Sequence, residues 1–255
     1  MLNELIQRMR QGHRTMAFPS DALRMPDRFR GRPEIRPGPL PEATLDRAVA
    51  ACPVGALCRE EGGSLALDMG ACLFCGACEA ASDGAVRFTR DYRLAARRRE
   101  DLVVRAGPAK RMEPLEPARL RLYARSLKLR EVSAGGCNAC EADLNVLNTV
   151  VFDLGRLGIQ FVASPRHADG LLITGPVTEN MRLALLKTWE AVPPPKLVIA
   201  VGACAISGGP YLDHAEAHNG AVGTVPVELY IPGCPPHPIT ILDGLLRLLG
   251  RLPAP

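Results

Sequence analysis

The stretch Leu197-Val-Ile-Ala-Val-Gly-Ala-Cys204 decides the fold of the second half of the chain. Five apolar residues run into a glycine and a cysteine, a pattern typical of a buried strand that enters a tight turn. Comparable short apolar runs lie at Ser126–Val132, Ile159–Val162, Leu171–Thr174 and Val225–Ile231. Stretches with helical spacing separate them, at Asn138–Leu154, Thr178–Ala191 and Ile239–Leu249. Strands that alternate with helices predict a three-layer α/β domain on a parallel sheet.

Cysteines directly follow three of these predicted strands. Cys137 and Cys140 come after the first strand, and Cys204 and Cys234 come after the last two. Because the carboxyl ends of parallel strands meet at one edge of a sheet, we expect the four thiols to converge. Four thiolates suit either a [4Fe–4S] cluster or a structural zinc ion, and the pattern alone leaves both open.

The first half of the chain carries a different cysteine pattern. Cys72, Cys75 and Cys78 form a CxxCxxC run, and Cys52 precedes a proline. Bacterial two-cluster ferredoxins contain CxxCxxCxxxCP twice, and the fourth cysteine of each run ligates the other cluster. Here Ser82 stands where the fourth cysteine of the second run would be. The surviving four cysteines are therefore predicted to hold one [4Fe–4S] cluster, with zinc as the alternative.

The missing cysteines form one complete ligand set. In the first run, Glu42, Leu45 and Ala48 occupy the three positions where cysteines would stand. Together with the change at Ser82, these replacements delete every ligand of one cluster and spare every ligand of the other. The leftover Cys58 is expected to be a packed, inert thiol, with a role as fourth ligand as the alternative.

Length and composition favour two domains and no nucleic-acid role. The 255 residues suffice for two domains, and the net charge of +4 does not suggest a nucleic-acid partner. We divide the chain into an extended arm (1–40), a small cysteine-rich domain (41–105), a linker (106–125) and the α/β domain (126–255). The basic stretch 91–125 is interpreted as a helix followed by a linker. Its arginines favour a solvated or subunit-facing surface, with anionic lipid as the alternative.

Signals for export or membrane insertion are not expected in this sequence. The first residues lack the apolar core of a signal peptide and the twin-arginine signal, and no apolar run reaches the ~18 residues that span a bilayer. We therefore expect a cytoplasmic chain with reduced thiols, in which CxxC spacing favours metal over disulfide.

Residues 126–250 resemble the small electron-transfer subunit of membrane-associated group 4 [NiFe]-hydrogenases, as in formate hydrogenlyase. More distantly, they resemble the 20 kDa (B) subunit of NADH:quinone oxidoreductase. The matching segments are GGCNACEADLN (135–145), FVASPRHADGLLITGPVTENMRLALLKTWE (161–190), KLVIAVGACAISGG (196–209) and VPVELYIPGCPPHPITILDG (225–244). The resemblance implies a flavodoxin-like fold. It also implies a [4Fe–4S] cluster near the partner's active site, on Cys137, Cys140, Cys204 and Cys234.

Residues 20–105 resemble the ferredoxin-like subunit of the same complexes. The resemblance rests on DRFRGRPE (27–34), the two cysteine elements and FTRDYRLAARRREDL (88–102). The chain thus looks like a fusion of two neighbouring subunits in which one cluster is lost. We expect an α/β flavodoxin-like parallel-sheet domain preceded by a small α+β ferredoxin-like domain.

This resemblance implies an oxidoreductase subunit that relays electrons through two [4Fe–4S] clusters. The electrons would pass to or from the [NiFe] site of a separate large subunit, where protons and H₂ interconvert, so no complete active site is expected on this chain. Other iron–sulfur subunits and membrane-arm subunits are implied as partners, with a peripheral location on the inner face of the cell membrane. The alternatives are a subunit of a complex I-like quinone oxidoreductase or nickel-free relative, and a zinc-stabilised assembly scaffold.

Two sequence details bear on these alternatives. The complex I subunit has its first two cluster cysteines adjacent, whereas here Cys137 and Cys140 are separated by two residues, which favours a hydrogenase partner. Glu141 is a candidate for proton movement at the subunit interface. The alternative is an acid stabilised by the N-terminus of its helix, the interpretation that we favour.

Overall fold

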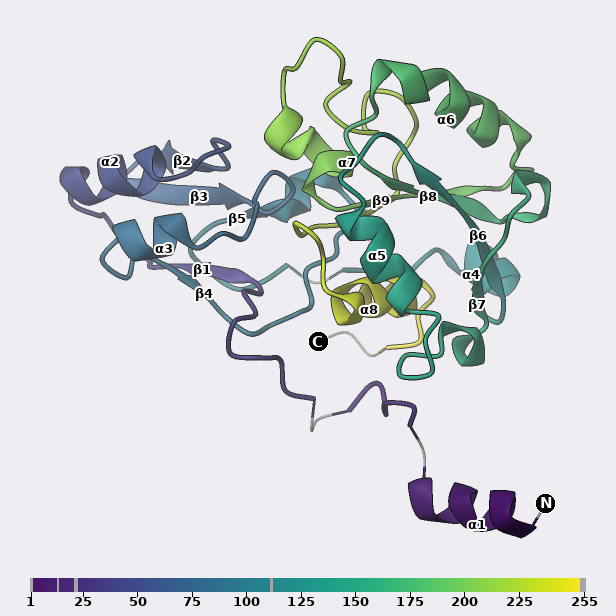
Figure 1. Ribbon diagram of the computed structural model, residues 1–255. Helices are drawn as coiled ribbons and strands as arrows, with labels where there is room; N and C mark the ends of the chain where they lie inside the picture. The colour runs from purple at the N-terminus through teal and green to yellow at the C-terminus, as the bar shows by residue number, and fades with distance from the viewer. Residues whose placement is uncertain (1, 13, 21–22, 111, 253–255) are drawn as a thin grey trace.

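The computed structural model describes residues 2–12, 14–20, 23–110 and 112–252. Two units lie side by side, a larger α/β unit and a smaller α+β unit (Figure 1). The larger unit contains all the strands of a five-stranded sheet, and the smaller unit contains a two-stranded and a three-stranded sheet.

The larger unit is built on a fully parallel sheet. Its strands are β6 (Leu127–Ser133), β7 (Ile159–Phe161), β8 (Gly170–Thr174), β9 (Leu197–Val201) and β10 (Leu229–Ile231). Their spatial order is β10-β9-β8-β6-β7. Counted along the chain this is the order 2-1-3-4-5, which is that of flavodoxin-like folds. The predicted fold class is confirmed.

Helices cover both faces of this sheet, as Figure 1 shows. Helices α5 (Ala139–Val146) and α8 (Pro238–Leu248) pack on one face, in a core that includes Ile199. Helix α6 (Glu179–Ala191) packs on the other face, in a core that includes Val198. Neighbouring strand residues thus point to opposite layers, as the pleat requires.

Two predicted elements are shorter than the sequence suggests. The helix expected over 138–154 ends at Val146, whose carbonyl oxygen accepts a hydrogen bond of 2.7 Å from the Thr149 hydroxyl. The β-branched Thr149, Val150 and Val151 also have low helix propensity. The strand expected from residue 225 begins at Leu229, because Pro226 has no N–H to donate to the ladder.

The smaller unit has the antiparallel pairings of an α+β domain. Strand β1 (Pro33–Ile35) pairs with β4 (Val86–Phe88), and β3 (Ser64–Asp68) pairs with both β2 (Leu57–Glu60) and β5 (Val103–Val104). Helices α2 (Glu42–Ala50) and α3 (Ala77–Ala81) complete the unit. Strand β1 belongs to this unit, although it lies within the predicted arm.

The basic stretch after residue 91 differs from the expected helix followed by a linker. Residues 91–105 contain the 3₁₀ turn η1 (Arg99–Leu102) and strand β5, and the helix in this region is α4 (Pro117–Tyr123), within the predicted linker. Further 3₁₀ turns are η2 (Leu154–Leu157), η3 (Pro165–His167) and η4 (Gly209–Tyr211).

Backbone hydrogen bonds and a shared core join the two units. Ala96 and Tyr230 exchange two backbone hydrogen bonds, of 3.0 and 2.8 Å, so the smaller unit extends the large sheet beyond β10. Ala200 and Ile206 of the larger unit lie in the same apolar core as the buried residues of the smaller one. The units therefore form one packed body.

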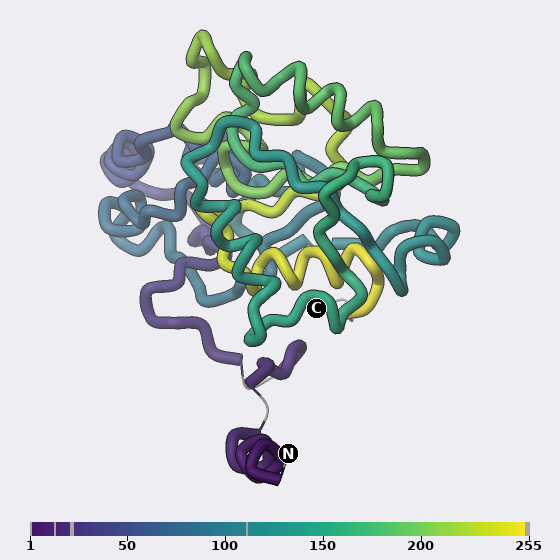
Figure 2. The backbone as a smooth tube through the Cα atoms, turned by 45° about the vertical axis from the view of Figure 1, so that its right-hand side comes forward, coloured from purple at the N-terminus to yellow at the C-terminus, as the bar shows by residue number. Residues whose placement is uncertain are grey.

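The N-terminal arm packs against the larger unit. Phe18 and Met25 are buried in the core that contains α8. Helix α1 (Leu2–Gln11) has no buried side chain and stands apart from the body in both views (Figures 1 and 2). Among the described residues, no helix is long and apolar enough to span a bilayer.

Candidate metal centres

Four cysteines lie at the carboxyl edge of the large sheet, where the sequence places them. Cys137 follows β6, and Cys140 lies in the first turn of α5. Cys204 lies in α7 (Ala203–Ser207) directly after β9, and Cys234 follows β10. Cys204 is buried, whereas Cys137 and Cys234 are exposed.

These four thiols act on one another electrostatically. Burial raises the pKa of the Cys204 thiol to about 11, and the charges of Cys234 and Cys137 contribute to that rise. Burial, Glu141 and the other three cysteines raise the pKa of Cys140. Four thiolates close enough to repel one another need a strongly positive centre between them, which iron or zinc ligation supplies.

The backbone around this group leaves no room for side chains. A Cβ on Gly202 would lie 2.5 Å from the Cys140 sulfur, and the residue has φ +88°. A Cβ on Gly209 would lie 3.1 Å from the Cys204 sulfur. Both glycines therefore keep the surroundings of the sulfurs clear, and the donor set fits the four-thiolate ligation of a [4Fe–4S] cluster.

The second group of thiols lies in the smaller unit. Cys52 follows α2, Cys72 and Cys75 lie in the loop after β3, and Cys78 lies in α3. Burial raises the pKa of Cys72 to about 12, and the charges of Cys78, Cys52 and Cys75 contribute to the rise. Burial, Cys52 and Cys75 raise the pKa of Cys78 to about 11.

Backbone N–H groups point at these sulfurs. The N–H of Ala56 donates to the Cys52 sulfur, and that of Phe74 donates to the Cys72 sulfur, each at 3.2 Å. Such hydrogen bonds stabilise negative charge on ligand sulfurs and tune the potential of an iron–sulfur cluster. A Cβ on Gly76 would lie 2.5 Å from the Arg30 Nε, so a guanidinium packs directly on this loop.

The structure corrects the expectation for Cys58. This thiol is exposed rather than packed, because Leu57 points inward from β2 and the next side chain points outward. The charge of Cys52 raises the pKa of both Cys72 and Cys78, whereas Cys58 contributes to neither shift. The arrangement favours Cys52 over Cys58 as the fourth ligand.

Three of the four positions where ferredoxin ligands are missing lie in the protein interior, whereas the fourth, Glu42, is exposed. Leu45 and Ala48 lie on α2 and are buried in the core of the smaller unit. Ser82 is fully buried, and its hydroxyl oxygen accepts a hydrogen bond of 3.0 Å from the Val86 N–H. Apolar packing and a turn thus occupy the three buried positions.

Glu141 is buried and held by two hydroxyl groups that the sequence did not single out. Ser133 and Thr174 each donate a hydrogen bond of 2.6 Å to Glu141 Oε1. Burial raises the pKa of this carboxyl, but the two hydrogen bonds and that of its own backbone N–H outweigh the burial and lower the pKa overall. Both partners lie at strand ends, at the last residues of β6 and β8, where a topological switch point forms.

The segments that carry the two groups of thiols meet at the seam between the units. The Ser207 hydroxyl, at the end of α7, donates to the Gly70 carbonyl oxygen at 3.1 Å, two residues before Cys72. A cavity of about 290 Å³ is lined by residues of both units, among them Phe74 and Cys234. In the described part of the chain, no three His, Cys, Asp or Glu side chains are placed to hold a single metal ion.

Comparisons with known proteins match the larger unit. The family model of the NADH ubiquinone oxidoreductase 20 kDa subunit matches residues 137–248, which include all four cysteines at the sheet edge. Formate hydrogenlyase subunit 7 of Escherichia coli is 45% identical over 133 residues, which are 52% of this chain and 52% of that protein. The alignment thus spans about half the length of that relative.

Two further relatives are covered more completely. The probable membrane-bound hydrogenase subunit mbhJ of Pyrococcus furiosus is 36% identical over 143 residues, 56% of this chain and 86% of that protein. The B subunit of the NADH-quinone oxidoreductase of Heliobacterium modesticaldum is 37% identical over 134 residues, 52% of this chain and 76% of that protein. The chain therefore belongs to the family of the NADH ubiquinone oxidoreductase 20 kDa subunit.

Proposed function

We propose that this chain is an electron-transfer subunit with two [4Fe–4S] clusters, and that it serves the large subunit of a membrane-associated [NiFe]-hydrogenase. Cys52, Cys72, Cys75 and Cys78 hold one cluster, and Cys137, Cys140, Cys204 and Cys234 hold the other. The observation that carries the proposal is the presence of two separate four-thiol groups, each with mutual electrostatic effects, in one packed body.

The cofactors supply reversible one-electron chemistry, and the residues of the chain position and tune them. The N–H groups of Ala56 and Phe74 stabilise negative charge at the sulfurs of the smaller unit. Gly202 lets the backbone approach Cys140, and the Ser207–Gly70 hydrogen bond fixes the distance between the two loops. The two loops are therefore in direct contact.

The exposed side of the larger unit is suited to a partner. Cys137 and Cys234 are exposed. Tyr211 and Leu212, which follow the helix that carries Cys204, are large exposed hydrophobic residues. Exposed apolar side chains beside a redox centre favour a protein–protein contact at which a large subunit docks. This placement supports a terminal position for the Cys137 group in the electron path.

Relatives named as NADH-quinone oxidoreductase subunits support a second candidate, a complex I-like quinone reductase. Anaerobic affinity purification from the source cells, followed by nickel analysis and an assay of H₂-dependent viologen reduction, separates the two. We expect a nickel-containing large subunit and H₂-dependent activity. A nickel-free partner that reduces quinone would overturn the hydrogenase assignment and leave the two-cluster assignment in place.

A further inference from the structure

The backbone of Arg32 is fixed at the seam between the two units. Its N–H donates to the Asp91 carbonyl oxygen at 2.9 Å, and its own carbonyl oxygen accepts from the N–H and the hydroxyl of Thr89, at 3.0 and 2.9 Å. The neighbouring Gly31 lies so close that a Cβ there would be 2.2 Å from the Asp91 carbonyl oxygen. The position from which the Arg32 side chain extends is therefore rigid.

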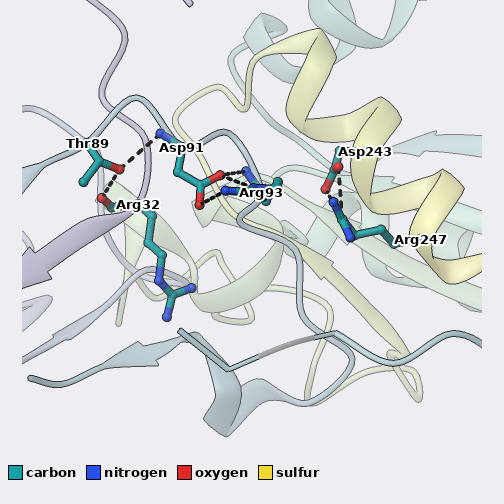
Figure 3. Close-up of polar contacts among 6 residues, drawn as sticks. All are labelled: Arg32, Thr89, Asp91, Arg93, Asp243 and Arg247. Carbon is teal, nitrogen blue, oxygen red and sulfur yellow. Dashed lines mark hydrogen bonds and ion pairs between the residues drawn. The ribbon is translucent and has the colours of Figure 1, made fainter. Parts of the chain in front are cut away.

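The guanidinium of Arg32 makes no hydrogen bond within the described part of the chain. In Figure 3 it points away from the Asp91 carboxylate. Burial lowers the pKa of Arg32, and Asp91 raises it, yet a guanidinium remains charged at any physiological pH. A partly buried cation with free N–H donors is thus available to a ligand.

Two of the acids that line a cavity together with this guanidinium are paired with other arginines. Asp91 accepts hydrogen bonds from Arg93 Nε at 2.6 Å and Nη2 at 3.0 Å. Asp243 on α8 accepts from Arg247 Nε at 2.9 and 3.0 Å. Figure 3 shows these two pairs on one side of Arg32. Asp91 and Asp243 thus have basic partners of their own, and neither accepts a hydrogen bond from the Arg32 guanidinium.

Arg32 lines three adjoining cavities, of about 340, 670 and 220 Å³. The largest cavity is also lined by Arg36, whose exposed guanidinium makes no hydrogen bond to a described residue. The cavity of about 340 Å³ is lined by Arg97, whose Nε is buried with no hydrogen-bond partner among the described residues. Guanidinium groups thus line these cavities at more than one position.

We propose that Arg32 is the centre of a binding site for a phosphate group, which Arg32 contacts with its free N–H fork and Arg36 contacts from the rim. A planar guanidinium matches two phosphate oxygens, and two arginines that donate to no described carboxylate match the charge of a phosphate better than that of a single carboxylate. The phosphate group belongs either to a small soluble compound or to a phospholipid headgroup. The site does not depend on the metal centres, so it can be tested separately from them.

The test is a titration of the full chain, purified without oxygen, with inorganic phosphate at constant ionic strength in a calorimeter. Phosphate should bind, and equivalent chloride should not. Arg32→Gln should weaken binding by about tenfold or more, because a charge-assisted hydrogen bond is lost. Arg32→Lys should have an affinity for phosphate between those of the unaltered chain and Arg32→Gln, because it keeps the charge but loses the paired N–H donors of the guanidinium. Arg182→Gln, on the exposed surface of α6 and outside the three cavities, should bind as the unaltered chain does.

A second variant, at an exposed position, tests the site even if Arg32→Gln fails to fold. Arg36 is exposed, so Arg36→Gln should keep the unfolding midpoint of the unaltered chain and still weaken phosphate binding several-fold. Equal binding by the unaltered chain, Arg32→Gln and Arg36→Gln would overturn the proposal. An identical response to phosphate and chloride would also overturn it.

Vesicles distinguish the two sources of the phosphate group. Sedimentation of the unaltered chain, but not of Arg32→Gln, with phosphatidylglycerol vesicles supports a lipid headgroup. Binding of inorganic phosphate without sedimentation supports a soluble phosphate compound. Absence of any Arg32-dependent binding in both arms contradicts the site.

Discussion

The Ser207 hydroxyl donates a hydrogen bond of 3.1 Å to the Gly70 carbonyl oxygen and so links the two cysteine loops across the seam. Ser207 ends the helix that contains Cys204, and Gly70 lies two residues before Cys72. The same hydroxyl lies 3.1 Å from the Ala203 carbonyl oxygen of its own helix. One side chain thus connects the backbone segments of both thiol groups.

Gly70→Ala should widen this seam. The new Cβ would lie 2.8 Å from Ile206 Cγ2 and 2.9 Å from Arg99 Cζ, so both side chains must move. Moving Arg99 would disturb its ion pair with Asp68. We expect a loss of about 1–3 kcal/mol in the free energy of unfolding, as is usual for overpacking. Electron exchange between the two centres should also slow, because it falls steeply with separation.

Chemical denaturation and freeze-quench electron paramagnetic resonance of the loaded protein measure these two effects. Gly223→Ala is the matched control, because a Cβ there has no neighbour within 4 Å. Unchanged stability and unchanged electron exchange in Gly70→Ala would show that the contact does not set the distance.

Gly202→Ala should remove the metal centre of the larger unit and spare the other. Its Cβ would lie 2.5 Å from the Cys140 sulfur. The iron content should fall by about four atoms per chain, the content of one [4Fe–4S] cluster. Gly38→Ala is the control, since Gly38 has a nearly equal φ of +90° and open space around its Cβ position. Full iron content in Gly202→Ala would contradict the assignment of Cys140.

Cys52→Ser and Cys58→Ser test the fourth ligand of the smaller unit. Cys52→Ser should lower the iron content by up to about four atoms per chain or convert the cluster, because a ligand is lost. Cys58→Ser should leave the iron content unchanged, because this exposed thiol does not contribute to the pKa shifts of the ligand group. The reverse result would identify Cys58 as the ligand.

Ser82→Cys should not create a further cluster. Leu45 and Ala48 occupy two of the other ligand positions and are buried in the core. The substitution should also weaken the hydrogen bond that Ser82 accepts from Val86, with a loss of about 1 kcal/mol in the free energy of unfolding. Iron analysis and denaturation check both effects, and a gain of about four irons would refute the account of the missing ligands.

The sheet and the cysteine positions at its edge followed from local sequence patterns. A short apolar run that ends in Gly-Ala-Cys204 predicts both the strand and the place of the thiol, because parallel strands bring their carboxyl ends together. The end of α5 at Val146 was not predicted, since it depends on the Thr149 hydroxyl and the β-branched residues after it. The exposure of Cys58 was missed because it depends on which face of β2 is buried. Leu57 points into the core, so the side chain of Cys58, the next residue, points outward.

The contacts between the two units could not be predicted from the sequence. Ala96 pairs with Tyr230, and Gly70 contacts Ser207, at separations of more than 100 residues. Such contacts depend on how the two units pack together and leave no periodicity in either segment. The free guanidinium of Arg32 was hidden for the same reason, because its surroundings include Asp243 from the last helix.

The most direct test of the two-centre assignment is the metal content and spectrum of the full chain purified without oxygen. We expect about eight irons and eight acid-labile sulfides per chain, with a broad absorbance near about 400 nm that bleaches on reduction, as two [4Fe–4S] clusters require. Reduction should give paramagnetic signals from two clusters. A colourless protein that contains zinc and no iron would contradict the assignment.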